Sequence, residues 1–177
     1  HGLDITRGSF TCGEPINHRL LSNAYSVDLF LSAKKDDVEA AFQSNVPAAR
    51  VHGIPTKYKK GATDQIRIAF DGDAVIFSDS SERIYQQEKI EGFMRHEREK
   101  AREPLKHGPF GKLFLSLAYL QSKLGDEARN LLRLGIVTAR NSPAHERVIR
   151  TLRAWGIHDY EIHFLGGQSK GAFLEAF

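Results

Sequence analysis

The segment QIRIAFDGDAVIFSD, residues 65–79, decides the fold, because it places Asp71 and Asp73 directly after a short apolar run. That run, Gln65 to Phe70, is typical of a buried β-strand, and the Gly72 between the acids lets the backbone turn. If the strand is parallel and central, both carboxylates lie at its carboxyl end, where α/β sheets bind ligands. The segment therefore predicts a fold class and a candidate site together.

A β-hairpin is an open alternative for the same residues. Asp-Gly between two apolar runs is a strong hairpin signal, with residues 67–70 pairing back onto residues 74–77. A calcium-binding loop is excluded, because Val75 and Ile76 stand where such a loop needs an oxygen ligand and a glycine.

Strand and helix patterns alternate along the rest of the chain. Further strands are expected at residues 27–31, 132–138 and 162–165. Residues 110–120 and 148–155 carry apolar side chains every three or four positions, which predicts two helices with one buried face each. This alternation favours an α/β fold with a mainly parallel sheet.

The boundaries of the remaining elements follow from local signals. Ser142 is expected to cap the helix at 148–155, with Pro143 as its first residue. Residues 81–101 are helical in pattern but highly charged, so this helix is expected to be mostly solvated. Residues 52–63 have the composition of a linker, and their basic cluster Lys57-Tyr58-Lys59-Lys60 is interpreted as a solvated part of it.

The composition excludes several classes of protein. The chain has 177 residues, 41% of them hydrophobic and 27% charged, which is ordinary for a globular protein. A formal net charge of +3 is too small to indicate a nucleic-acid surface, so no nucleic-acid polymer is expected as a partner. The single Cys12 suits a reducing compartment, and neither a membrane span nor a signal peptide is recognisable. We therefore expect a cytoplasmic protein without membrane contact.

The aspartate pair suggests phosphate chemistry. Asp71 has the right chemistry to be a nucleophile on phosphorus, and Asp73 to be the acid that protonates the leaving oxygen. Carboxylate oxygens also suit a hard cation such as Mg²⁺.

Two later segments are compatible with phosphate binding. In IVTARNS, residues 136–142, the hydroxyl of Thr138 and the backbone at Ala139 form a candidate phosphate cradle, although a helix cap at Ser142 alone explains the pattern. In GGQSKG, residues 166–171, the residue order of a P-loop is missing, but Lys170 can neutralise phosphate charge.

Four strings carry a family resemblance: AFDGDAVIFSDSSE, LGIVTARNS, TLRAWGI and FLGGQSKGAFLEAF. They resemble the cytosolic 5′-nucleotidase type I family and its bacterial relatives, within the haloacid dehalogenase superfamily. The stretch from HGLDITRGSFTCGEP to AYSVDLFLS resembles the segment that precedes the catalytic half of that family. The resemblance implies a Rossmann-like parallel sheet with a small helical cap at about residues 80–106.

The resemblance also implies a reaction, the Mg²⁺-dependent hydrolysis of nucleoside 5′-monophosphates through an aspartyl-phosphate. By position, Asp71 is the nucleophile, Asp73 the acid/base and Lys170 the charge-neutralising lysine, while Thr138 and Ala139 bind phosphate. Mg²⁺ would be held by the Asp71 side chain, the Asp73 backbone carbonyl and an acidic pair expected beyond Phe177.

The domain organisation implied by the resemblance has three parts. Residues 1–51 correspond to the end of a preceding half-unit, 52–63 to a linker, and 64–177 to a catalytic core that is incomplete at its end. A faint repeat between residues 2–13 and 156–167 also suggests two similar units. We expect an interior fragment of a longer 5′-nucleotidase, with little activity by itself and an unpaired strand edge that favours homo-oligomers.

Two other functions stay open: a non-catalytic module that binds nucleotide or phosphate, and a phosphatase for another small phosphate ester. An acidic pair soon after Phe177 would favour an enzyme over a binding module. Tyr85, Phe93 and Phe110 are candidates for stacking on a nucleoside, although ordinary packing is the simpler explanation.

Overall fold

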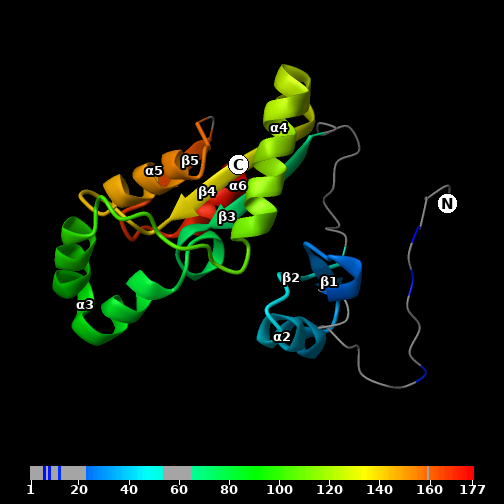
Figure 1. Ribbon diagram of the computed structural model, residues 1–177, viewed down its shortest axis with the longest axis horizontal. Helices are drawn as coiled ribbons and strands as arrows, with labels where there is room; N and C mark the ends of the chain where they lie inside the picture. Colours follow the sequence, from blue (N-terminus) through cyan, green and yellow to red (C-terminus); the bar gives the residue numbers. More distant parts are fainter. Residues whose placement is uncertain (1–5, 7, 9–11, 13–22, 54–64, 159) are drawn as a thin grey trace. The chain divides into compact units, whose positions relative to one another are not determined.

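The computed structural model describes residues 6, 8, 12, 23–53, 65–158 and 160–177. The chain divides into two units, His1–Thr56 and Lys57–Phe177, and each contains parallel strands and helices (Figure 1). The basic cluster at 57–60 and most of the first repeat copy at 2–13 lie outside the described residues.

The first unit contains a parallel β–α–β arrangement. Its elements are β1 (Phe30–Ser32), α2 (Lys35–Gln43) and β2 (Ala48–Arg50), with Phe30 opposite Ala48. Its small core consists of the buried Ala41, Val46 and Ala48. The strand expected at 27–31 begins only at Phe30, because left-handed backbone at Ser26 (φ 52°) and a bend at Asp28 precede it.

The second unit holds the predicted segment in a three-stranded parallel sheet of order β3-β4-β5. Its elements are β3 (Ile66–Asp71), η1 (Gly72–Ile76), α3 (Ser80–Glu99), α4 (Gly111–Leu131), β4 (Leu132–Thr138), α5 (His145–Ala154), β5 (Glu161–Phe164) and α6 (Lys170–Ala176). The hairpin alternative is wrong: β3 pairs in parallel with β4, with Phe70 opposite Ile136. Residues 72–76 form a wide turn, which the Phe77 N–H closes by donating to the Gly72 carbonyl at 3.0 Å. The predicted α/β, Rossmann-like parallel fold is confirmed. Among the described strands of this sheet, β4 is central and β3 lies at the edge.

The central strand β4 packs on both of its faces. Leu134 and Ile136 enter the main core, together with Phe114 of α4 and with Val148 and Leu152 of α5. On the other face lies Gly135, where an added Cβ would come within 2.7 Å of the Phe177 ring. The periodicity of two along the strand therefore places α4 and α5 on one face and the end of α6 on the other.

The helix predicted at residues 148–155 corresponds to α5, but its predicted start at Ser142 and Pro143 is wrong. The helix begins at His145, with Ala144 as its N-cap and no side-chain cap. Ser142 and Pro143 lie in the preceding turn. The His145 N–H donates to the Asn141 carbonyl at 3.0 Å and the Glu146 N–H to the Pro143 carbonyl at 3.2 Å, so backbone hydrogen bonds close this turn without a serine cap. The Arg140 side chain adds a bond to the Ala144 carbonyl oxygen at 3.3 Å.

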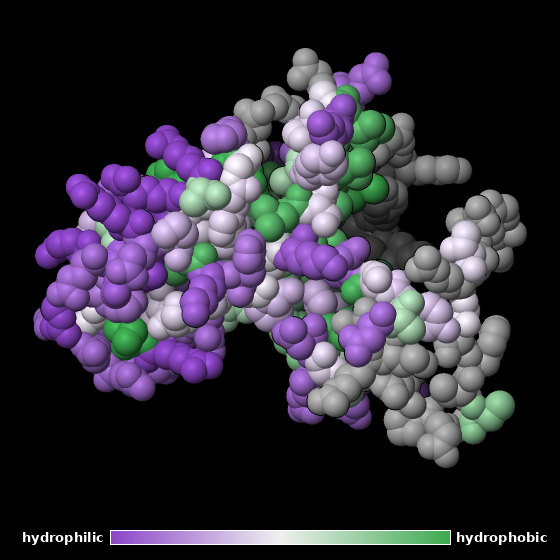
Figure 2. All heavy atoms as spheres, in the orientation of Figure 1, coloured by the Kyte–Doolittle hydropathy of each residue, from purple (hydrophilic) through white to green (hydrophobic). Residues whose placement is uncertain are grey.

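Helix α3 follows β3 and η1 in the chain and lies on the side of the sheet toward which the β4 arrow points (Figure 1). It is broken at Lys89, whose φ is 57°. Its surface is mainly hydrophilic, as the charge pattern predicts (Figure 2). Three of its side chains are nevertheless buried, those of Ser81, Phe93 and Glu97.

Candidate active site

Asp71 ends β3 and lies beside Lys170 at the carboxyl edge of the sheet. Its Oδ1 accepts a hydrogen bond from the Gly72 backbone N–H at 2.7 Å, and its Oδ2 accepts one from Lys170 Nζ at 2.5 Å. Lys170 is the first residue of α6, which Ser169 caps by accepting from the Gly171 N–H. The two side chains are 44% and 33% exposed, so a ligand can reach this pair from solvent.

Gly72 is required by a close approach and not by its φ angle. An added Cβ would lie 3.1 Å from Thr138 Cβ and 3.2 Å from its Oγ1. The left-handed residue of the turn is Ala74, with a φ of 59°, a conformation that costs a non-glycine residue about 1 kcal/mol. The glycine between the two acids therefore lets β4 bring its hydroxyl against the turn that follows β3.

Asp73 is held by the loop that follows β4. Arg140 donates to it through both Nη2, at 2.6 Å from Oδ1, and Nε, at 2.9 Å from Oδ2. Thr138 Oγ1 donates to Asp73 Oδ2 at 3.5 Å and accepts from the Arg140 backbone N–H at 3.2 Å. The hydroxyl predicted to bind phosphate thus lies next to Asp73, in register with the end of β3.

Arg140 also joins a buried ionic network. Its Nη1 donates to Glu97 Oε2, and Arg147 Nη1 donates to Glu97 Oε1 at 2.9 Å. Burial would lower the pKa of Arg140, but hydrogen bonds and charge attraction from Asp73 and Glu97 raise it above its ordinary value. The guanidinium therefore stays charged and links Asp73 to α3.

Sequence patterns alone bring Asp71, Asp73, Thr138 and Lys170 to one edge but miss Arg140 and Glu97. Arg140 lies inside the quoted IVTARNS segment, where a long cation two residues after the hydroxyl is the available signal. Glu97 lies in a run of charges that is typical of a solvated surface, so its burial has no local sequence signal.

A cavity of about 290 Å³ adjoins Asp73 and Arg140. It lies between α3 and the loops that follow β4 and β5, and Ala139, Tyr85 and Phe93 are among the residues that line it. The ring of Phe93 also lies under the Arg140 guanidinium, 5.3 Å from its carbon. The remaining lining residues are Glu82, Ile90, Met94, Asn141, Gly166 and Gly167.

Phe110 does not line this cavity. Its ring packs edge-on against Phe70, at 6.5 Å between centroids, and it borders the main core. This contact supports ordinary packing, the simpler explanation for the residue.

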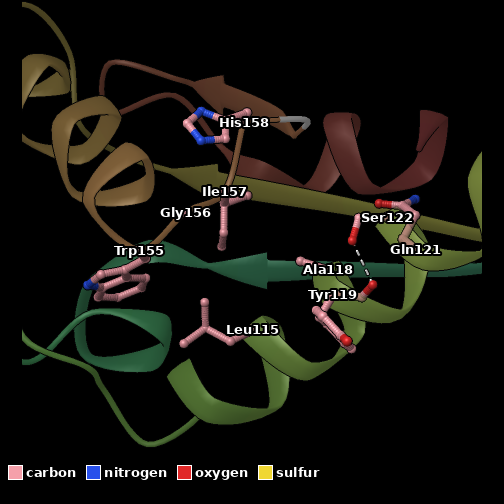
Figure 3. Close-up of a pocket in the computed structure, with 9 residues that line it drawn as sticks. All are labelled: Leu115, Ala118, Tyr119, Gln121, Ser122, Trp155, Gly156, Ile157 and His158. Atoms are coloured by element: carbon pink, nitrogen blue, oxygen red, sulfur yellow. Dashed lines mark hydrogen bonds between the residues drawn. The ribbon is translucent and has the colours of Figure 1, made fainter.

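A second cavity, of about 340 Å³, lies between α4 and the residues after α5 (Figure 3). Leu115, Tyr119, Trp155 and His158 are among its lining residues, and the Ser122 hydroxyl beside it donates to the Tyr119 carbonyl at 2.8 Å. It contains none of the predicted site residues, whereas Asp73 and Ala139 line the first cavity.

The site offers carboxylate and carbonyl oxygens, the ligand atoms that a hard cation prefers, but only a few of them. Asp71 supplies a carboxylate, and Asp73 a backbone carbonyl in the turn that follows. Within the described ranges, no group of three or more His, Cys, Asp or Glu side chains is positioned to hold a metal ion. The donors near Asp71 therefore fit part of an Mg²⁺ site.

The fold and the site together define a class: an α/β protein that gathers carboxylates, a hydroxyl and a lysine at the carboxyl ends of parallel strands, where such sheets bind ligands. The 5′-nucleotidase family profile matches residues 1–177. The chain belongs to the 5′-nucleotidase family.

One relative is human cytosolic 5′-nucleotidase 1B, 34% identical over 179 residues, an alignment that covers 98% of this chain and 29% of the relative. The chain thus spans less than a third of the length of that relative. No solved structure gives a significant match. In the part of the chain that is described, no helix is both long and apolar enough to cross a bilayer.

Proposed function

We propose that the protein containing this chain hydrolyses nucleoside 5′-monophosphates to nucleoside and phosphate, with Asp71 as the nucleophile. The observation that carries the proposal is the ion pair between Asp71 and Lys170 at 2.5 Å, next to Asp73 and open to solvent. A nucleophilic carboxylate must approach an anionic phosphate, and a lysine beside it offsets the repulsion. The family membership and the name of the human relative support the nucleotide as substrate.

In the first step an Asp71 carboxylate oxygen attacks phosphorus, and the bond from phosphorus to the ester oxygen breaks. Asp73 gives its proton to that leaving oxygen, which departs as the 5′-hydroxyl of the nucleoside. In the second step Asp73 takes a proton from water, which attacks the aspartyl-phosphate and releases inorganic phosphate. Lys170, Thr138 and the backbone at Ala139 bind the phosphate oxygens throughout.

Mg²⁺ is proposed as the cofactor, held by the Asp71 carboxylate, the Asp73 backbone carbonyl and acidic residues beyond the given sequence. When bound, it neutralises negative charge on the phosphate. All other roles in the reaction fall to the side chains named above.

We also propose a domain organisation, a location and a tendency to self-associate. Residues 64–177 form the catalytic core with a cap at about 80–106, residues 1–51 belong to a preceding half-unit, and 52–63 link them. The protein is proposed to be cytoplasmic, and the edge position of β3 supports self-association of this polypeptide by itself.

The test of the proposed function is phosphate release from a panel of esters by the full-length protein with Mg²⁺. Nucleoside 5′-monophosphates should be hydrolysed faster than sugar phosphates. Preference for a sugar phosphate would establish the phosphatase alternative, whereas nucleotide binding without any hydrolysis would establish the binding module.

The 177-residue polypeptide by itself should show little or no activity at millimolar Mg²⁺, because a site with one carboxylate binds this cation weakly. The measurement is specific activity of the fragment beside that of the full-length protein. Comparable values would contradict the need for metal ligands beyond Phe177.

A further inference from the structure

Glu97 is a carboxylate without solvent contact. Its side chain is 0% exposed, although it belongs to the most charged helix of the chain. Its Oε1 accepts from the Ser81 hydroxyl at 2.7 Å and from Arg147 Nη1 at 2.9 Å, and its Oε2 accepts from Arg140 Nη1. A buried charge is retained only when it is paired and hydrogen-bonded, and Glu97 meets both conditions.

Arg140 has one side facing Glu97 and another facing Asp73. Nε and Nη2 form a two-point contact with the Asp73 carboxylate, while Nη1 is occupied by Glu97 and by the Ala144 carbonyl. A planar guanidinium held at both ends cannot rotate without breaking charged hydrogen bonds. The direction of the Asp73 carboxylate is therefore fixed by Arg140, and that of Arg140 by Glu97.

The network also balances charge. Two carboxylates, Asp73 and Glu97, face two guanidiniums, Arg140 and Arg147. Arg147 is anchored separately by the Glu103 carbonyl, which accepts from its Nε at 2.9 Å. Loss of the Glu97 charge would leave two buried cations with one partly exposed carboxylate, so Arg140 would move toward solvent and Asp73 would lose its orientation.

We propose that Glu97 is a positioning residue: from α3 it holds Arg140, and through Arg140 it aims the Asp73 carboxyl at the leaving oxygen. This inference rests on the proposed function, since it assigns Glu97 a part in proton transfer by Asp73. If so, the contribution of Glu97 to kcat depends on how much the leaving group needs a proton.

The experiment compares two esters in the full-length protein and in its Glu97→Gln variant. From a nucleoside 5′-monophosphate the nucleoside would leave as an alkoxide and needs the acid, whereas 4-nitrophenyl phosphate releases the stable 4-nitrophenolate. Acid catalysis typically contributes about 10²–10⁴-fold, so kcat for the nucleotide should fall at least about 10-fold, with kcat for the nitrophenyl ester nearly unchanged. The matched control is Glu99→Gln, an exposed glutamate on the same helix, which should alter neither rate.

Equal losses on the two esters would overturn the proposal, because a merely structural role does not distinguish leaving groups. No loss on the nucleotide would overturn it as well. In an Asp73→Asn background, Glu97→Gln should add no further loss on the nucleotide, and additive losses would contradict action through Asp73.

Should Glu97→Gln fail to fold, Glu97→Asp keeps the charge and should give the same leaving-group pattern at smaller amplitude. Failure of the proposed function has its own signature, since the unmodified protein would then not hydrolyse the nucleoside 5′-monophosphate.

Discussion

Both units contain parallel strands, but the polar side chains at the ends of these strands find their hydrogen-bond partners in different parts of the chain. At the end of β1, Ser32 Oγ donates to Asp37 at 2.8 Å and accepts from the Lys34 N–H at 3.1 Å, all within five residues. At the end of β3, Asp71 binds Lys170, which lies 99 residues away in the chain.

This difference separates a structural strand end from one that is proposed to be functional. A hydroxyl bonded to its own neighbours needs no other part of the fold, and it completes a turn. Asp71 and Asp73 are instead held by cations from α6 and from the loop after β4, so both carboxylates are oriented only when the second unit is folded. The first strand of a parallel pair thus ends in a simple turn in one unit and at the proposed site in the other.

The largest effect is expected at the nucleophile. Asp71→Asn in the full-length protein should lower kcat for nucleoside monophosphates by at least about 10³-fold, since an amide cannot form the covalent intermediate. Asp37→Asn, in α2 at the residue that accepts from Ser32 at the end of β1, should leave kcat unchanged. Near-normal turnover by Asp71→Asn, or an equal loss in Asp37→Asn, would remove the distinction between the two strand ends.

A smaller effect is expected at the lysine. Lys170→Met should reduce kcat/KM by about 10²-fold, because an aligned cation stabilises charge that develops at the phosphate. Lys34→Met is the matched control, since this exposed lysine follows β1 and contacts Ser32 only through its backbone N–H. Steady-state kinetics with one nucleotide compares them, and indistinguishable values for the two variants would mean that Lys170 serves only the fold.

The sequence predicted the β3 end well because its information is local. Polar residues that directly follow strands of one parallel sheet meet at one edge, so Asp71, Thr138 and Lys170 could be placed together. Arg140 and Glu97 depend on how α3 packs over the loop after β4. Glu97 does not differ in its local sequence from an ordinary surface charge, and the position of Arg140 two residues after the hydroxyl does not show what packs over it, so that contact could not be predicted.

The start of α5 was mispredicted for a local reason. Ser142 and Pro143 have the chemistry of a helix start, but both lie in a turn that backbone hydrogen bonds close, from the His145 N–H to Asn141 and from the Glu146 N–H to Pro143, and α5 begins at His145. A capping preference of about 1 kcal/mol is small enough for this backbone geometry to outweigh it.

The smallest effect concerns stability. Arg133 on β4 bonds Glu161 on β5 at 2.6 Å, and this hydrogen bond lowers the pKa of Glu161 below its ordinary value. The contribution is therefore present above the unfolded-state pKa of about 4.3 and is lost as pH falls through the lower folded value.

Glu161→Gln should cost at most about 1 kcal/mol of unfolding free energy at pH 7, and the difference from the unmodified protein should shrink as pH falls below the ordinary carboxyl range. Denaturant unfolding at several pH values measures it. Glu39→Gln, which removes the more exposed Lys35–Glu39 pair of α2, should cost less. A Glu161 effect that grows toward acid would contradict a lowered pKa for this carboxyl in the folded protein.

The proposed reaction depends above all on a covalent bond between Asp71 and phosphorus. The direct measurement is to quench the full-length protein during turnover of a nucleoside monophosphate, reduce it with borohydride, and sequence its peptides by mass spectrometry. An aspartyl-phosphate is reduced to homoserine, so homoserine is expected at position 71 in samples with substrate and unmodified aspartate in samples without it. Active turnover with aspartate intact at position 71, or homoserine at a different aspartate, would contradict Asp71 as the nucleophile.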